Sequence, residues 1–218
     1  MSAASDLHGS APDRSPVVLL VIDAINDFDF EDGRPVLADA LPVARRIRRL
    51  KQVARRAGIA TVYVTDNFGR WRSDFRTLVA HCLRAGARGR AMTRLLRPDR
   101  RDYFVLKPKH SAFHSTALDL LLDHLGARTL ILTGLLADSC ILLTAHEAHM
   151  RGYHVVVPED CVAARRPEDR RQALAVMRRA LDADTRPAEA LDVKALPRGV
   201  VRRGSRRPPP RKRRAGSG

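Results

Sequence analysis

The chain has 218 residues, with 40 Lys and Arg against 24 Asp and Glu, and a formal net charge of +16. This length suits one α/β domain with a full core, and no apolar run approaches the roughly 20 residues of a membrane span, which argues against a membrane protein. Three cysteines, Cys82, Cys140 and Cys161, form no CxxC pair. That pattern argues against a disulfide frame and a structural zinc site, and favours a reducing, cytoplasmic location.

Both ends of the chain are predicted to be disordered. Residues 1–15 are small and polar, and they lack the apolar segment of a signal peptide. Residues 196–218 hold nine of the sixteen net positive charges and no acid, which leaves +7 for the body. Such a tail cannot bury apolar surface. It is either a solvated extension, which we favour because it lacks aromatic residues, or a contact for nucleic acid or another polyanion.

The ordered part, residues 16–195, opens with an aliphatic run at 17–22 that is typical of a buried parallel strand. Asp23 follows it, where a carboxylate serves either a ligand site or a turn. An acidic, aromatic loop over 24–35 is predicted to line a pocket. A helix over 42–57 is indicated by its apolar stripe and by Gly58 after its end.

The next strand is predicted at 59–65, and a loop from Asp66 to Trp71 follows it. Two helices are then indicated, at 73–84 and at 90–97, with Cys82 in the core.

A third strand at 102–107 ends in Lys107, directly before a proline. Lysine prefers solvated helix faces, so a lysine that closes an apolar strand is expected to face inward. His110 and His114 lie in the following loop and are interpreted as hydrogen-bonding loop residues. A helix over 115–125 follows, with Ser115 as its cap.

The fourth strand is predicted at 129–133, with Gly134 ending it. Asp138 is predicted to cap a helix over 139–151, which Gly152 terminates. Cys140 would lie in the first helical turn, where unpaired N–H groups and the helix dipole stabilise a thiolate. The alternative is that Cys140 is a small buried hydrophobe.

The remaining elements are a strand at 154–157, a helix at 167–180 and a weak edge strand at 183–191, with Cys161 interpreted as inert. The alternation of strands and helices predicts a three-layer α/β/α domain with a mostly parallel, five- or six-stranded sheet.

Three chemically distinctive residues follow strands of this sheet: Asp23, Lys107 and Cys140. The carboxyl ends of parallel strands meet at one edge, so these side chains are expected to lie together. A carboxylate can take the thiol proton, and an ammonium can stabilise the thiolate. These three residues could therefore serve as a cysteine nucleophile, the base that deprotonates it and the cation that stabilises it.

The motifs around these residues resemble those of the isochorismatase-like cysteine hydrolases, which include nicotinamidases and N-carbamoylsarcosine amidases. The matching segments are VIDAINDF at 21–28, KPKHSAFHST at 107–116, TGLLADSCILLTA at 133–145 and GYHVVVPEDCVAA at 152–164. The resemblance covers about residues 16–185 and implies the isochorismatase-like hydrolase fold.

The resemblance implies that Asp23 is the base, Lys107 the activating cation and Cys140 the nucleophile. It also implies a cis peptide between Leu135 and Leu136, and an oxyanion hole made by the N–H groups of Leu136 and Cys140. The reaction would be attack on a carbonyl, loss of ammonia or an amine, and hydrolysis of the thioester. Isochorismatases proper lack the cysteine, so Cys140 favours carbonyl chemistry.

Several positions depart from the family pattern. Ile25 stands where glutamine is usual, and Leu136 is bulky where a small residue is common. Nicotinamidases bind a metal through an aspartate and closely following histidines, but Asp66 is followed by no histidine until His81. The sequence therefore predicts no metal, no cofactor and a substrate other than nicotinamide.

Four residues are candidates for the wall of the substrate pocket, with packing as the alternative for the aromatic ones: Phe28, Asn67, Trp71 and Phe113. Two functions follow from the sequence. The favoured one is a cysteine hydrolase that cleaves an amide or carbamoyl C–N bond of a small molecule, and the resemblance implies a homo-oligomer. The other is a non-catalytic scaffold that binds nucleic acid or another polyanion through its basic surface and tail.

Overall fold

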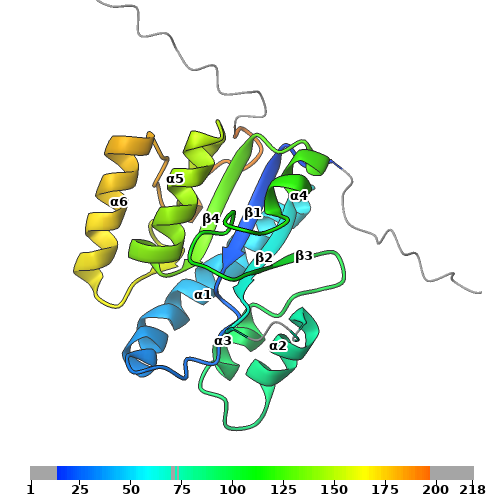
Figure 1. Ribbon diagram of the computed structural model, residues 1–218. Helices are drawn as coiled ribbons and strands as arrows, with labels where there is room; N and C mark the ends of the chain where they lie inside the picture. Colours follow the sequence, from blue (N-terminus) through cyan, green and yellow to red (C-terminus); the bar gives the residue numbers. More distant parts are fainter. Residues whose placement is uncertain (1–13, 70–71, 73, 197–218) are drawn as a thin grey trace, which may run out of the picture.

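The structure is a computed structural model that describes residues 14–69, 72 and 74–196 (Figure 1). The basic tail from residue 197 and the pocket candidate Trp71 lie outside the described residues, as do residues 1–13.

A parallel sheet forms the centre of the domain. Its strands are β1 (Val17–Ile22), β2 (Ala60–Asp66), β3 (Tyr103–Lys107), β4 (Thr129–Leu135), β5 (His154–Val156) and β6 (Val162–Ala163). Their order is β3-β2-β1-β4-β5, with β6 paired to β4, and each of these pairs is parallel. The predicted parallel sheet is confirmed. The order reverses between β1 and β4, and in such sheets ligands bind at the carboxyl ends beside the reversal.

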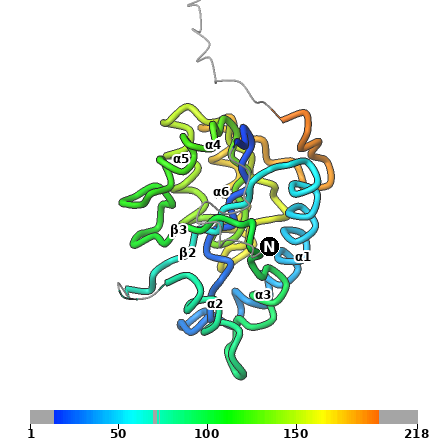
Figure 2. The backbone as a smooth tube through the Cα atoms, turned by 90° about the vertical axis from the view of Figure 1, so that its right-hand side faces the viewer, coloured from blue at the N-terminus to red at the C-terminus, as the bar shows by residue number. Residues whose placement is uncertain are grey.

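Helices cover both faces of the sheet. They are α1 (Gly33–Arg56), α2 (Phe75–Leu83), α3 (Arg90–Leu95), α4 (Leu118–Leu125), α5 (Leu142–Met150) and α6 (Pro167–Leu181), with a π-helical turn η1 (Ala137–Ile141) and a 3₁₀ turn η2 (Ala188–Ala190). Figure 2 shows α1 on one side of the strands and α4 and α5 on the other. None of the helices that the structure describes has the length and apolarity that crossing a membrane requires.

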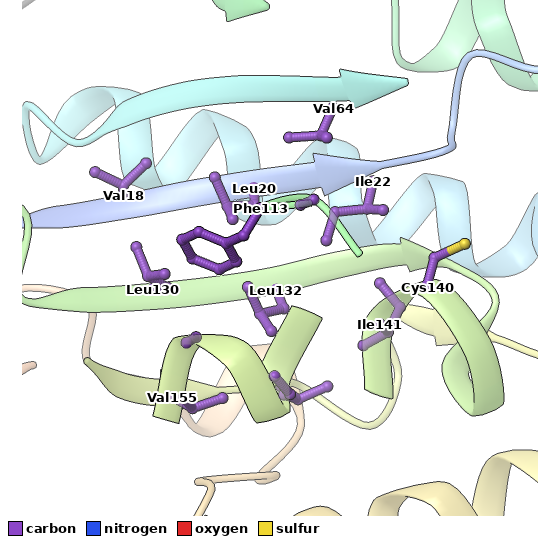
Figure 3. Close-up of a cluster of buried hydrophobic side chains, with 14 of the residues drawn as sticks. Val18, Leu20, Ile22, Val64, Phe113, Leu130, Leu132, Cys140, Ile141 and Val155 are labelled. Atoms are coloured by element: carbon purple, nitrogen blue, oxygen red, sulfur yellow. The ribbon is translucent and has the colours of Figure 1, made fainter. Parts of the chain in front are cut away.

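Alternating side chains of β1 divide the core into two clusters. Val18, Leu20 and Ile22 pack with α4, α5 and α6 (Figure 3). Val17, Leu19 and Val21 pack with α1, α2 and α3. This alternation is the period of a strand that is buried on both faces, and it confirms the three-layer prediction.

The helix α1 begins at Gly33, well before the predicted start at residue 42. Pro42 lies inside the helix, although proline is commoner in a first turn because it has no N–H to donate. Val36 and Ala40 extend the buried stripe upstream of Pro42. Their burial against the sheet explains why the helix passes through the proline.

Gly134 does not end β4 but lies within it, with φ at +116°. A Cβ at this position would lie 1.9 Å from the carbonyl oxygen of Ile22 on β1. The glycine is therefore required by the close approach of two central strands. The prediction that it stops the strand was wrong.

Two further predictions were wrong. The helix α4 begins at Leu118 rather than at 115, and the hydroxyl of Thr116, not of Ser115, accepts a hydrogen bond at its start, from Leu118 N at 3.2 Å. The predicted edge strand at 183–191 is reduced to one bridge between Asp184 and Val156, followed by η2.

Candidate active site

Asp23 directly follows β1 and is held in place by the neighbouring strand. Its N–H donates to the carbonyl oxygen of Val64 at 2.8 Å, and its Oδ1 accepts from the N–H of Asp66 at 3.0 Å. The residue has φ at +49° and is 8% exposed. The backbone at the end of β2 therefore fixes the orientation of the carboxylate.

Lys107, the last residue of β3, is fully buried, as the sequence predicts. Its Nζ lies 2.9 Å from Oδ2 of Asp23 and 3.8 Å from Oδ2 of Asp66. It also donates to the carbonyl oxygen of Lys109 at 3.1 Å. A buried ammonium is tolerated because carboxylates and a carbonyl replace its water shell.

Cys140 lies in η1, beyond the end of β4, and is 8% exposed. Its Sγ is 3.6 Å from Nζ of Lys107. Figure 3 shows the sulfur pointing away from the apolar cluster that holds the rest of the residue. The structure therefore brings together Asp23, Lys107 and Cys140 from the ends of three strands.

The local geometry at Cys140 differs from the prediction of an α-helical first turn. Leu136, not Asp138, occupies the capping position of η1, and it makes no side-chain cap. The N–H groups of Ser139 and Ile141 both donate to the carbonyl oxygen of Leu136 at 3.1 Å. The peptide bond between Leu135 and Leu136 is cis.

The protonation of the thiol also differs from the prediction of a stabilised thiolate. Burial, and then the negative charge of Asp23, raise the pKa of Cys140 to about 12, although Lys107 acts to lower it. The charge of Lys107 does not offset these two effects. Cys140 is therefore a thiol at rest, and its deprotonation needs a base.

The other two groups complete this electrostatic arrangement. Burial raises the pKa of Asp23 above its ordinary value, while the charge of Lys107 and hydrogen bonds from Cys140 and Lys107 oppose the rise. Burial acts to lower the pKa of Lys107, but Asp23 and Cys140 reverse this, so the pKa lies above its ordinary value. A protonated lysine thus adjoins a carboxylate of increased basicity, which is hydrogen-bonded to the thiol.

The candidate pocket residues have different surroundings. Asn67 is 6% exposed beside the triad, and its N–H donates to the carbonyl oxygen of Lys107 at 3.1 Å. Phe28 is fully buried in the α1 core, so the loop after β1 contributes to packing at this point rather than to a pocket wall. Phe113 is buried and contacts the ring of Tyr153 and the guanidinium of Arg151. Both phenylalanines are thus packed in the interior, which is the alternative to a pocket wall.

The sequence interpretation missed a contact of His110. Its Nδ1 lies 3.8 Å from Sγ of Cys140, and its side chain is exposed. The only sequence signal was its position three residues after Lys107, because a loop pattern does not specify which side chain turns back to the sheet.

At the end of β2, Asp66 contacts Lys107 and the backbone. Oδ2 of Asp66 lies near Nζ of Lys107, and Oδ1 accepts a 2.6 Å hydrogen bond from the N–H of Phe68. A metal cation at Asp66 would be repelled by the lysine. Within residues 14–69, 72 and 74–196, no three His, Cys, Asp or Glu side chains form a group that could hold a metal.

Comparisons with known proteins agree with this fold. The family model described as "Isochorismatase domain" matches residues 17–188. The uncharacterized isochorismatase family protein YaaI of Bacillus subtilis (strain 168) is 35% identical over 173 residues, covering 79% of this chain and 94% of that protein. The ureidoacrylate amidohydrolase RutB of Methylorubrum extorquens is 27% identical over 176 residues, covering 68% and 70%.

A solved structure gives the same result. The N-carbamoylsarcosine amidase of Thermoplasma acidophilum superposes with a TM-score of 0.63 at 29% identity, covering 81% of this chain and 98% of that one. The chain belongs to the isochorismatase family of hydrolases, as the resemblance of its motifs predicts.

Proposed function

We propose that this protein hydrolyses an amide or carbamoyl C–N bond of a small molecule through a thioester on Cys140. The observation that carries the proposal is the convergence of the three side chains, with Nζ of Lys107 2.9 Å from the Asp23 carboxylate and 3.6 Å from Sγ of Cys140. The names of the relatives support the type of bond, because ureidoacrylate amidohydrolase and N-carbamoylsarcosine amidase both denote C–N cleavage.

The first half of the reaction uses the buried carboxylate. Asp23 takes the thiol proton as Sγ attacks the carbonyl carbon, and its raised pKa makes this transfer less unfavourable. Lys107 stabilises the negative charge near the sulfur. The N–H groups of Leu136 and Cys140 are proposed to donate to the developing oxyanion.

Collapse of the tetrahedral intermediate breaks the C–N bond. Asp23 returns the proton to the departing nitrogen, which leaves as ammonia or an amine, and the acyl group remains on Sγ. Water then attacks the thioester, and the acid product and the free thiol are released. The proton that Asp23 took from the thiol thus leaves with the ammonia or amine.

Ammonia release from a panel of amides, carbamoyl compounds and ureido acids tests the proposal. We expect turnover of at least one class, and its loss by about 10⁴-fold or more in Cys140→Ala, because no other group can form the thioester. Cys82→Ala is the matched control, since Cys82 is a core thiol outside the triad. Undiminished turnover by Cys140→Ala would contradict the proposal.

A further inference from the structure

The nucleophile has a buried side and a solvent side. Asp23 and Lys107 contact Cys140 from within, at 8% and 0% exposure. His110 is an exposed residue that contacts the same sulfur from the loop after β3, with Nδ1 3.8 Å from Sγ. A water molecule arriving from solvent therefore meets the imidazole beside the sulfur.

The loop holds His110 at this position from both sides. On one side, Nζ of Lys107 donates to the carbonyl oxygen of Lys109 at 3.1 Å. On the other side, the N–H of Ala112 donates to Oγ1 of Thr144 on α5 at 3.0 Å. The contact between the imidazole and the sulfur thus arises from a segment that is anchored to the triad and to the helix after Cys140.

The second half of the proposed reaction needs acid–base help at the sulfur. Sγ is the leaving group of the thioester, and a thiol with a pKa of about 12 leaves slowly unless it is protonated or stabilised. Asp23 lies on the buried side of the sulfur, and by this stage it has returned its proton to the departing nitrogen. His110 has the required chemistry on the side from which water approaches.

We propose that His110 is a further catalytic residue, acting in thioester hydrolysis as base for the attacking water and then as acid for the departing sulfur. This inference rests on the proposed function. Nδ1 takes a proton from water as the new C–O bond forms. The C–S bond then breaks, and the imidazolium returns the same proton from Nδ1 to Sγ, so that a carboxylic acid and a neutral thiol result.

Acetyl transfer from p-nitrophenyl acetate tests this step without knowledge of the natural substrate. Release of p-nitrophenol reports acylation of Cys140, and the steady-state rate after the first turnover reports thioester hydrolysis. His110→Asn keeps a polar group near the sulfur but cannot accept a proton. His114→Asn is the matched control, because His114 is an exposed histidine of the same loop.

We expect His110→Asn to release one equivalent of p-nitrophenol rapidly and then to turn over about 10²-fold more slowly than the wild type, with acetyl-Cys140 accumulating in the mass spectrum. His114→Asn should match the wild type. His110→Gln provides a second variant if the asparagine protein has a lowered Tm.

Three results would overturn the inference. One is an unchanged steady-state rate in His110→Asn and His110→Gln. Another is an equal loss of the rapid phase and of the steady-state rate. His110 would then act in formation of the thioester rather than in its hydrolysis, and Cys140 would still be the nucleophile. The third is wild-type protein that releases p-nitrophenol no faster than Cys140→Ala, and this result would remove the proposed function as well.

Discussion

At the scale of single residues, two charged neighbours have opposite effects on the protonation of the Cys140 thiol. The charge of Asp23 raises the pKa of Cys140, whereas Lys107 acts to lower it. The sulfur consequently stays protonated at rest, and in the proposed mechanism the proton passes to Asp23 as the sulfur attacks the substrate.

Asp23→Asn should have opposite effects on two kinds of cysteine chemistry. Hydrolysis should be lost, because the base is removed. The pKa of Cys140 should fall, because the neighbouring negative charge is removed while Lys107 remains. The pH profile of iodoacetamide alkylation at Cys140, followed by peptide mass spectrometry, should therefore shift to lower pH. An unchanged or upward shift would contradict the electrostatic account, and Asp29→Asn, an exposed carboxylate of the same loop, is the control.

Lys107→Met should destabilise the fold at neutral pH by about 3–5 kcal/mol, because it leaves the buried Asp23 carboxylate without its partner. The folded-state pKa of Lys107 is raised, so its contribution to stability is present below 10.5 and is lost as pH rises through the folded-state value.

The pKa of Asp23 should rise further in Lys107→Met. The loss of unfolding free energy in this variant should therefore be smaller in acid, where Asp23 becomes protonated. Urea unfolding at neutral and at acid pH measures both effects. Lys109→Met, an exposed neighbour, should change stability by less than about 0.5 kcal/mol. An equal loss of stability in Lys107→Met and Lys109→Met would contradict the stabilising role of the buried ion pair between Lys107 and Asp23.

At the scale of elements, the strands were more predictable than the segments around them. The run Val17–Ile22 is predicted with its observed bounds, because every side chain is buried and the pattern ends at a carboxylate. The start of α1 and the π-helical turn were not predicted. Both depend on packing across the sheet, which overrides the local preferences of Pro42 and Asp138.

The close approach of β1 and β4 predicts different costs for two glycines. Gly134→Ala should cost roughly 4 kcal/mol or prevent folding, because the added methyl would lie 1.9 Å from the carbonyl oxygen of Ile22. Gly152→Ala should cost only about 1 kcal/mol, since its φ is +84° but no atom lies within 4 Å of the added methyl. Thermal unfolding compares them, and similar losses would contradict the assigned role of Gly134.

At the scale of the whole molecule, the parallel topology explains how distant residues form one site. Asp23 and Cys140 flank the position where the strand order reverses, and Lys107 reaches them past the end of β2. This convergence was predictable, because parallel strands end at one edge. The contact of His110 and the packing of Phe28 were not, since loop conformation has no periodic signal.

The basic tail is expected to be dispensable for hydrolysis. Ending the chain after Leu196 removes nine positive charges and lowers the formal net charge from +16 to +7, but it leaves Asp23, Lys107 and Cys140 in place. We expect kcat/KM and Tm to stay within twofold and about 2 °C of the full chain. Loss of turnover, together with salt-dependent binding of duplex DNA by the full chain alone, would favour the polyanion-binding alternative.

The most direct test of the account is the identity of the covalent intermediate. Protein quenched with acid during turnover of an amide or carbamoyl substrate should carry the acyl group on the peptide that contains Cys140. It should not carry the group on Cys82 or Cys161, which are 1% and 0% exposed and lie away from Asp23 and Lys107. Turnover without an adduct at Cys140, with the same outcome in His110→Asn, would contradict the thioester mechanism.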